Sequence, residues 1–251
     1  MTNDATLLEL QEHGFVRIPE FINGIELERL QSNIEDFIES VRPKIPAERI
    51  FYEDKTQEGS LKQIQHMDEY ADWAHSLFHS GELLGLAQKL LGGAVVPKNM
   101  QYFNKPPRLG RPTPAHQDGF YFMLDPCEAL TMWLALEPVD LENGCVHYVR
   151  GSHRGGMREH CRTSTLGFSQ GIADFPTQQD RQQSVAVHAE PGDLLVHDAM
   201  TIHYAGENRS EHRTRRALGF IYYSHRARVD GQRHAEYQSQ LANDLRAQGK
   251  I

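Results

Sequence analysis

Apolar and polar positions in the first third of the chain alternate with the period of an α-helix. Between residues 25 and 41, apolar residues recur every three or four positions with charged residues between them, which predicts an amphipathic helix. Residues 5–12 and 82–91 show similar spacing, and each segment is followed by glycine, a residue that commonly ends helices. The short apolar segment 15–18 is expected to be extended.

The pattern changes at about residue 94, where short apolar segments begin to alternate with turns rich in glycine, proline, asparagine and aspartate. This spacing is typical of a β-sandwich or barrel and not of a parallel sheet. We therefore expect one domain over residues 1–251, mainly β with flanking α-helices. Helices would extend to about residue 93, a double-sheet barrel would occupy about 94–224, and a polar tail over 225–251 would end in a helix. The polar stretch 151–180 has the length of a lid or a binding loop.

The composition is that of an ordinary globular protein. Hydrophobic residues make up 39% and charged residues 24% of the 251 positions. No segment approaches the roughly 20 apolar residues of a membrane span, and the N-terminus lacks the pattern of a signal peptide. The three cysteines form no CxxC pair, and an odd number argues against a disulfide framework. These features predict a cytoplasmic protein that does not enter membranes.

The net charge of −8 disfavours nucleic acid as a partner, because binding phosphates requires a concentrated basic surface. The arginine-rich run 209–216 could be read as such a surface. Its position in a strand-turn-strand context favours a different role.

A histidine and a carboxylate stand two positions apart in the segment Pro114–Phe122. If this segment is extended, His116 and Asp118 project from the same face, because strand side chains alternate with a period of two. Two histidines and one carboxylate form the facial triad of non-haem iron(II) oxygenases, which leaves positions open for a bidentate co-substrate and oxygen. A second histidine must then arrive from a distant strand. The HxD pair alone also occurs by chance, as an exposed polar strand edge.

A second segment supplies the missing histidine and a candidate anion-binding group. Residues 190–210 suggest a turn, a strand and a short link that ends at His203. Twelve residues later Arg215 begins an apolar strand in which it shares one face with Ala217 and Gly219. A buried arginine beside small residues would suit a dicarboxylic acid, because guanidinium pairs bidentately with carboxylate. The alternative is a surface arginine within the basic run.

Together these segments resemble the phytanoyl-CoA dioxygenase family of iron(II)- and 2-oxoglutarate-dependent oxygenases. The likeness extends from about residue 99 to residue 220, with the motifs in the family's order. The motifs that carry it are Asn104-Lys105-Pro106-Pro107, His116-Gln117-Asp118 with Phe120-Tyr121-Phe122, Trp133, Glu142-Asn143-Gly144-Cys145, Gly151-Ser152-His153, Pro191-Gly192-Asp193, and His203 through Asn208 to Arg215-Arg216-Ala217.

The resemblance implies a double-stranded β-helix (a cupin-like jelly roll) with an iron(II) centre held by His116, Asp118 and His203. Related halogenases have a small residue at the position of the carboxylate, so Asp118 favours hydroxylation. The implied reaction consumes O2 and converts 2-oxoglutarate to succinate and CO2 while an unidentified small molecule is oxidised. A monomer or a homodimer is expected.

The resemblance also implies a co-substrate pocket next to the metal. Arg215 is expected to bind the distal carboxylate of 2-oxoglutarate. One extra residue separates it from His203 compared with some relatives, so Arg213 and Arg216 remain alternatives. The other residues expected to line this pocket are Gln101, Trp133 and, by strand alternation alone, Thr131.

Several alternatives stay open from the sequence. His197, six residues before His203, is expected to pack structurally and not to bind metal. The same site would also serve desaturation, epoxidation or cyclisation, or the hydroxylation of a protein. Two further alternatives are a cupin-type zinc or manganese protein that does not use 2-oxoglutarate, in which Arg215 would have no role, and a binding module that has lost catalysis.

Overall fold

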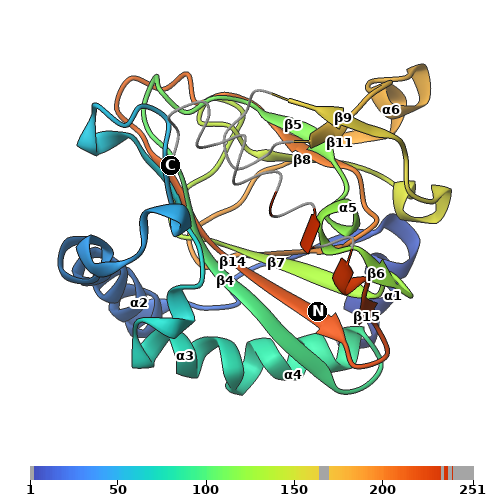
Figure 1. Ribbon diagram of the computed structural model, residues 1–251, viewed down its shortest axis with the longest axis horizontal. Coiled ribbons are helices and arrows are strands. Elements are labelled where there is room, and N and C mark those ends of the chain that lie inside the picture. The colour runs from blue at the N-terminus through green and yellow to red at the C-terminus, as the bar shows by residue number, and fades with distance from the viewer. Residues whose placement is uncertain (1–2, 164–169, 233–234, 237–238, 240–251) are drawn as a thin grey trace.

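Two antiparallel sheets face each other, and helices cover the outer face of the larger one (Figure 1). The computed structural model describes residues 3–163, 170–232, 235–236 and 239. The larger sheet has the strand order β1 (Phe15–Ile18), β12 (Leu194–Asp198), β7 (Ala129–Ala135), β14 (Arg215–Ser224), β4 (Val95–Lys105), β3 (Leu61–Ile64) and β2 (Ile50–Tyr52). The smaller sheet has the order β11 (Ser184–Val187), β8 (Val146–Val149), β13 (His203–Ala205) and β5 (Thr113–His116). This confirms the predicted jelly-roll fold, mainly β with flanking helices.

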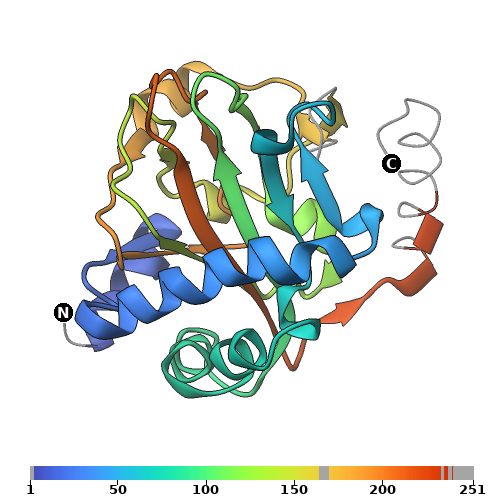
Figure 2. The same cartoon turned by 90° about the vertical axis from the view of Figure 1, so that its left-hand side faces the viewer.

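The helices predicted from the N-terminal periodicity are present. They are α1 (Asn3–His13), α2 (Gly24–Asp36) and α4 (Gly81–Leu90), and the end of the predicted 25–41 helix forms the π-helical turn η1 (Phe37–Val41). Figure 2 shows α2 crossing the outer face of the large sheet. The sequence pattern did not predict α3 (Asp72–His79), because this helix is too short for its periodicity to stand out. Single turns of 3-10 helix lie at η2 (Arg42–Lys44), η3 (Ala47–Arg49), η4 (Glu58–Ser60), η5 (Met67–Glu69) and η6 (Ser152–Gly155).

Side-chain alternation in the large sheet separates two hydrophobic clusters. In β14, Leu218, Phe220 and Tyr222 are fully buried against the helices on the outer face. Ala217, on the other face of the strand, belongs to the cluster enclosed by the two sheets, together with Trp133. The predicted alternation in β14 is therefore confirmed, and the inner face is free to carry the small and polar residues of a site.

Two local predictions need correction. The segment after residue 113 does not stay extended, because β5 ends at His116 and the short helix α5 (Asp118–Phe122) begins two residues later. The stretch 151–180 is not one irregular loop, since it contains β9 (His160–Arg162), β10 (Gln170–Ile172) and the start of α6 (Gln178–Gln183). Residues 164–169 of that stretch lie outside the described residues.

Most of the C-terminal tail also lies outside the described residues, including the predicted helix at its end. Within the described part, β15 (Arg228–Val229) pairs with β6 (Leu124–Asp125). None of the described helices combines the length and the apolar character that a membrane crossing requires.

Candidate metal centre

His116, Asp118 and His203 come together between the two sheets. His116 ends β5 and faces His203, the first residue of β13, in the register of this strand pair. The Nε2 atoms of His116 and His203 lie 3.4 and 3.7 Å from Oδ1 of Asp118, and the two ring centroids are 4.2 Å apart. One possible ligand atom from each residue lies within 4.8 Å of the other two. The spacing of the donors suits a single metal ion.

The carboxylate reaches the histidines although it stands in a helix. Gln117, between His116 and Asp118, keeps an extended backbone with φ −117° and ψ 127°, so its two neighbours still project to the same side. Its buried side chain fixes this link by donating hydrogen bonds from Nε2 to the backbone oxygens of Gly156 and Met200, at 3.0 and 2.8 Å. His116 and Asp118 therefore project to the same side, as expected. This arrangement depends on the extended backbone of Gln117 and not on a continuous strand.

Backbone carbonyls orient both imidazoles toward the carboxylate. Nδ1 of His116 lies 2.8 Å from the oxygen of Pro114, and Nδ1 of His203 lies 3.0 Å from the oxygen of Thr201. A carbonyl oxygen only accepts, so the proton of each neutral ring is on Nδ1 and the lone pair is on Nε2. Both Nε2 lone pairs therefore point to the space beside Asp118, as metal ligation requires.

A second layer of polar side chains holds the carboxylate. The hydroxyl of Thr131 donates to Oδ2 of Asp118 at 2.5 Å, and Nε2 of His197 lies 3.2 Å from the same oxygen. The hydroxyl of Tyr148 lies 3.1 Å from Nδ1 of His197 and extends the network. Thr131 thus contacts the carboxylate, whereas the sequence placed it around the co-substrate. His197, expected to pack structurally, touches a residue of the triad.

The charge states of the triad suit a metal cation. Burial alone would raise the pKa of Asp118, but the nearby His203 and the hydrogen bonds from His116 and His197 hold that pKa well below its usual value. Burial lowers the pKa of His203 well below that of free histidine, with further contributions from His116 and His197. At neutral pH an ionised carboxylate therefore faces a neutral imidazole, and these are the forms that bind metal.

Arg215 lies buried on the inner face of β14, and no carboxylate in the described part of the chain forms an ion pair with it. Arg215 is only 5% exposed, and its Nε atom has no hydrogen-bond partner among the described residues. The guanidinium carbon lies 5.2 Å from the centroid of the Trp133 ring. Burial lowers the pKa of Arg215 to about 10, so it remains charged at neutral pH. A buried cation of this kind requires an anion, and 2-oxoglutarate would supply one.

The structure separates the three candidate arginines. Arg213 pairs with Asp140 at 2.9 Å and also with Glu142, on the surface. Arg216 points to the other face of β14, where Glu137 accepts from its Nε at 2.6 Å and Glu35 pairs with its Nη1. Among the three, only Arg215 forms no ion pair with a carboxylate in the described part of the chain. Its position fits the co-substrate arginine better than either alternative.

The register of three strands places the other pocket residues beside one another. Gly219 of β14 lies between Gln101 of β4 and Trp133 of β7. A Cβ atom at Gly219 would lie 2.6 Å from the ring of Phe103, so the glycine is needed for this ring to pack against the strand. Gln101 accepts a hydrogen bond from Gln63 at 2.5 Å, on the neighbouring strand β3 that the sequence analysis missed.

Two buried lysines lie near Arg215. Burial lowers the pKa of Lys105 well below the usual value, and the charges of Arg215 and Lys62 lower it further. Burial also lowers the pKa of Lys62, which pairs with Glu53 at 3.2 Å. This excess of basic groups around a buried arginine favours an anionic ligand. The donor set and the unpartnered arginine therefore fit iron(II) and 2-oxoglutarate.

Comparisons with known proteins agree with this geometry. The sequence pattern of the phytanoyl-CoA dioxygenase (PhyH) family matches residues 10–217. A probable phytanoyl-CoA dioxygenase of Caenorhabditis elegans is 28% identical over 223 residues, covering 80% of this chain and 69% of that protein. The peroxisomal phytanoyl-CoA dioxygenase of Homo sapiens is 25% identical over 215 residues, covering 80% of this chain. The match spans only 62% of the human protein's length.

Solved structures with the same fold include enzymes bound to these groups. The epimerase SnoN, crystallised with Fe3+, alpha ketoglutarate and nogalamycin RO, superposes with a TM-score of 0.73 at 21% identity, covering 90% of this chain and 85% of SnoN. EvdO2 from Micromonospora carbonacea var. aurantiaca, complexed with 2-oxoglutarate, has a TM-score of 0.70 at 27% identity, covering 90% of this chain and 92% of EvdO2.

Proposed function

The chain belongs to the phytanoyl-CoA dioxygenase family of iron- and 2-oxoglutarate-dependent oxygenases, and we propose that it hydroxylates a small molecule. The observation that carries this proposal is the pairing, inside one barrel, of a His-Asp-His cluster with a buried arginine whose Nε has no hydrogen-bond partner among the described residues. Neither feature alone would distinguish an oxygenase from another metalloprotein. Together they fit a metal with open positions and a dicarboxylate that occupies some of them.

In this proposal His116, Asp118 and His203 hold iron(II), which when bound supplies the oxidation chemistry with O2 and 2-oxoglutarate. The chain's own contribution is to fix the ligands. The carbonyls of Pro114 and Thr201 set both histidine tautomers, and Thr131 with His197 holds Oδ2 of the carboxylate. Such outer contacts commonly change metal affinity by roughly 10- to 100-fold when they are removed.

Arg215 is proposed to bind the distal carboxylate of 2-oxoglutarate, with Trp133 and Gln101 lining the same pocket. The guanidinium offers paired N–H donors that match a carboxylate. Trp133 lies against the guanidinium and restricts its orientation. This positions the co-substrate between a fixed charge and the metal, and it excludes water from the buried pair.

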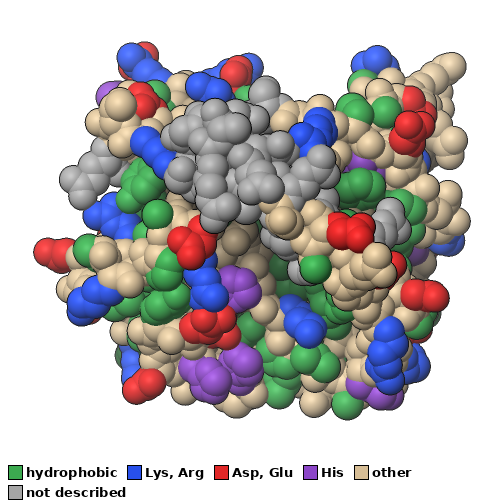
Figure 3. Space-filling model, in the orientation of Figure 1, with side chains coloured by type: hydrophobic (Ala, Val, Ile, Leu, Met, Phe, Trp, Pro, Cys, Tyr) green, Lys and Arg blue, Asp and Glu red, His purple; other side chains and the backbone are tan. Residues whose placement is uncertain are grey.

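The primary substrate would enter from the side where the barrel opens. On the face shown in Figure 3 the surface is hollowed near its centre, and hydrophobic, histidine and charged side chains are seen around this hollow. A small molecule with both apolar and polar groups fits such a site. SnoN has the same fold and is an epimerase, so desaturation, cyclisation or epimerisation at the same centre remains the second candidate.

The first experiment is an anaerobic titration of iron(II) and 2-oxoglutarate into the metal-free protein. We expect the weak visible charge-transfer band of the chelate in the wild type and its loss in His116→Ala. If iron binds but no band appears and 2-oxoglutarate does not bind, the protein is a metalloprotein of another kind.

A product assay then separates the reaction classes. Once a substrate that increases succinate formation has been found, mass spectrometry under 18O2 identifies the outcome. Hydroxylation adds one labelled oxygen atom to the product, desaturation or ring closure removes two hydrogens, and epimerisation leaves the mass unchanged. A product without added oxygen would overturn the hydroxylase assignment while leaving the oxygenase family intact.

A further inference from the structure

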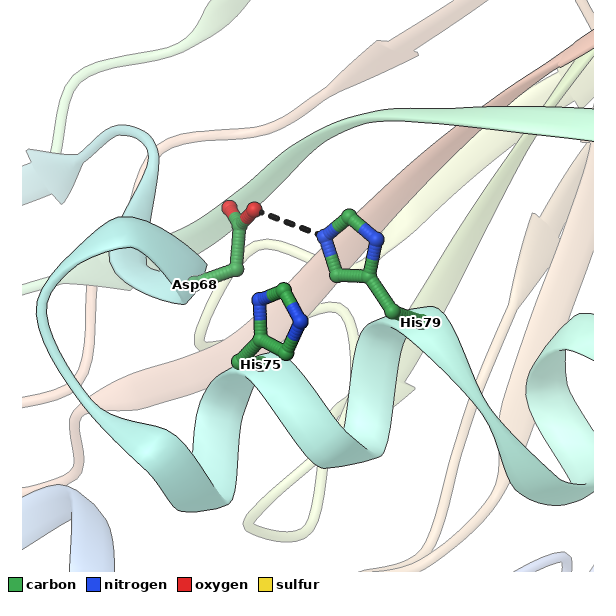
Figure 4. A group of neighbouring side chains, drawn as sticks. All are labelled: Asp68, His75 and His79. Atoms are coloured by element: carbon green, nitrogen blue, oxygen red, sulfur yellow. Dashed lines mark hydrogen bonds and ion pairs between the residues drawn. The ribbon is translucent and has the colours of Figure 1, made fainter.

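A second group of metal-ligand side chains lies away from the catalytic centre. Asp68 belongs to η5, and His75 and His79 stand one turn apart on α3 (Figure 4). Nε2 of His79 lies 3.0 Å from Oδ2 of Asp68, and one possible ligand atom of each residue lies within 4.8 Å of the other two. The described residues contain two such groups, this one and the His116 triad.

We propose that Asp68, His75 and His79 bind a divalent transition-metal ion, with Zn2+ as the best match. Two histidines at positions i and i+4 of a helix project from the same face, a spacing by which helices bind zinc. Two imidazole nitrogens and one carboxylate oxygen suit zinc and its neighbours in the transition series. They do not suit Mg2+ or Ca2+, which prefer oxygen ligands alone.

The carboxylate is already positioned for this role. Oδ1 of Asp68 accepts a hydrogen bond of 3.4 Å from the backbone N–H of Met100 in β4, which leaves Oδ2 directed at His79. A neighbouring face of α3 is anchored by the fully buried Ala74 and Phe78. The hydroxyl of Tyr222 also donates to the backbone oxygen of Phe78 at 2.9 Å. The two elements that carry the ligands are therefore fixed on the same sheet.

The ion pair between Asp68 and His79 does not account for His75. That side chain is exposed, and it makes no hydrogen bond or ion pair with the described residues. Its ring is stacked on His79, with centroids 4.2 Å apart and planes inclined by 13°. Figure 3 shows histidine side chains grouped at the surface over the region of α3. An exposed pair of stacked imidazoles beside a carboxylate is a ready set of donors for a metal.

Metal binding requires one small adjustment. Tetrahedral zinc with bonds of about 2.0–2.1 Å places its ligand atoms about 3.3–3.4 Å apart. Nε2 of His79 and Oδ2 of Asp68 are already 3.0 Å apart, so His75 is the ligand that must move. Lone pairs of parallel rings do not converge on one point, and His75 must therefore rotate about its side-chain bonds. Its exposure permits this rotation. Water would fill the fourth position, because the described residues offer only three donors here.

The site lies on the face of the large sheet opposite the catalytic centre. Asp68 contacts β4 from the side of the helices, whereas Trp133 and Arg215 face the space between the sheets. An ion held here would join η5 to α3 and stabilise the folded chain by RT ln(1 + [Zn2+]/Kd). It would not need to take part in the oxidation, so it is independent of the proposed reaction.

The test counts zinc sites in the metal-free full chain by equilibrium dialysis against ZnCl2. Two histidines and a carboxylate at the catalytic triad would also bind zinc, so the measurement uses the His116→Ala background as well as the wild type. We expect two ions per wild-type chain, one in His116→Ala, one in His75→Ala and none in the double variant. Loss of one of three ligands should weaken binding at this site at least tenfold.

The matched control is His212→Ala, which removes a histidine whose side chain is 89% exposed and outside the cluster. It should keep both ions. Zinc should also raise the thermal midpoint of His116→Ala, and this increase should disappear when His75 is replaced as well. Asp68→Asn is the second variant, with the carboxylate removed and the histidines kept. The proposal is overturned if His116→Ala binds no zinc, or if His75→Ala and Asp68→Asn both keep both ions.

Discussion

Replacing Arg215 by methionine tests the co-substrate site, because it removes the buried charge and keeps a side chain of similar length. At an effective dielectric constant of 20, two unit charges 4 Å apart attract by about 4 kcal/mol. Truncation of one partner in a buried charge pair usually costs about 2–5 kcal/mol of binding free energy. With about 3 kcal/mol lost, and a tenfold change for each 1.4 kcal/mol, the Kd for 2-oxoglutarate should rise on the order of 100-fold.

The same substitution should not destabilise the protein in the absence of ligand. The Nε atom of Arg215 is buried without a partner among the described residues, so the folded chain carries the desolvation penalty of this charge. Exchange of buried charged groups for apolar ones of similar volume is often neutral, or stabilising by about 1–4 kcal/mol. Loss of affinity without loss of stability would distinguish a binding residue from a structural one.

The assay is the anaerobic titration of 2-oxoglutarate into the iron(II)-loaded protein, with the chelate absorption as the readout and urea denaturation in parallel. Arg213→Met is the matched control, because Arg213 is 38% exposed and paired with Asp140 and Glu142. Its removal should change the Kd by less than about a factor of five, as expected for an exposed pair. Wild-type affinity in Arg215→Met, with iron bound, would refute the assignment of the arginine.

Three further predictions concern the metal ligands, the fold and the dependence of binding on pH. Thr131→Val removes the 2.5 Å hydrogen bond to Asp118 with little change of volume, and iron affinity measured by competition with a chelator should fall roughly 10- to 100-fold. Gly192→Ala should lower the free energy of unfolding, measured by urea denaturation, by about 3 kcal/mol or more, because φ is +90° there and a Cβ would overlap a backbone carbonyl oxygen. Gly85→Ala, in an open helix position, should instead raise it by about 0.5–1 kcal/mol. Burial holds the pKa of Lys105 well below normal, and an anion beside it should raise that pKa again. Binding of 2-oxoglutarate should therefore be accompanied by proton uptake. Its affinity should fall as the pH rises above the pKa of Lys105 in the ligand-free protein. Calorimetry in buffers of different ionisation enthalpy measures this uptake.

Each of these predictions has a contrary result. Unchanged iron affinity in Thr131→Val would mean that the hydroxyl does not orient the carboxylate. Equal stability of the two alanine variants would remove the conformational argument for Gly192. Binding enthalpies that are independent of the buffer would show that Lys105 keeps its charge state when the co-substrate binds.

The sequence alone determined the class of fold and the family. Helical periodicity, strand alternation and turn residues are local properties, and they correctly predicted α1, α2, α4 and the two faces of β14. The metal triad was also accessible from the sequence, because the HxD pair and the later histidine are part of motifs that resemble a known family. For α3 the local pattern was too short, and that helix carries two residues of the proposed second metal site.

Only the tertiary structure decided which side chains surround the triad. His197 and Thr131 are 66 residues apart in the sequence, and they reach the same carboxylate oxygen because they are opposite each other in the register of β12 and β7. The choice among the three arginines likewise depends on which carboxylates the fold brings to each one. Register and long-range packing arise from contacts across strands, and the periodicity of a single chain segment does not contain them.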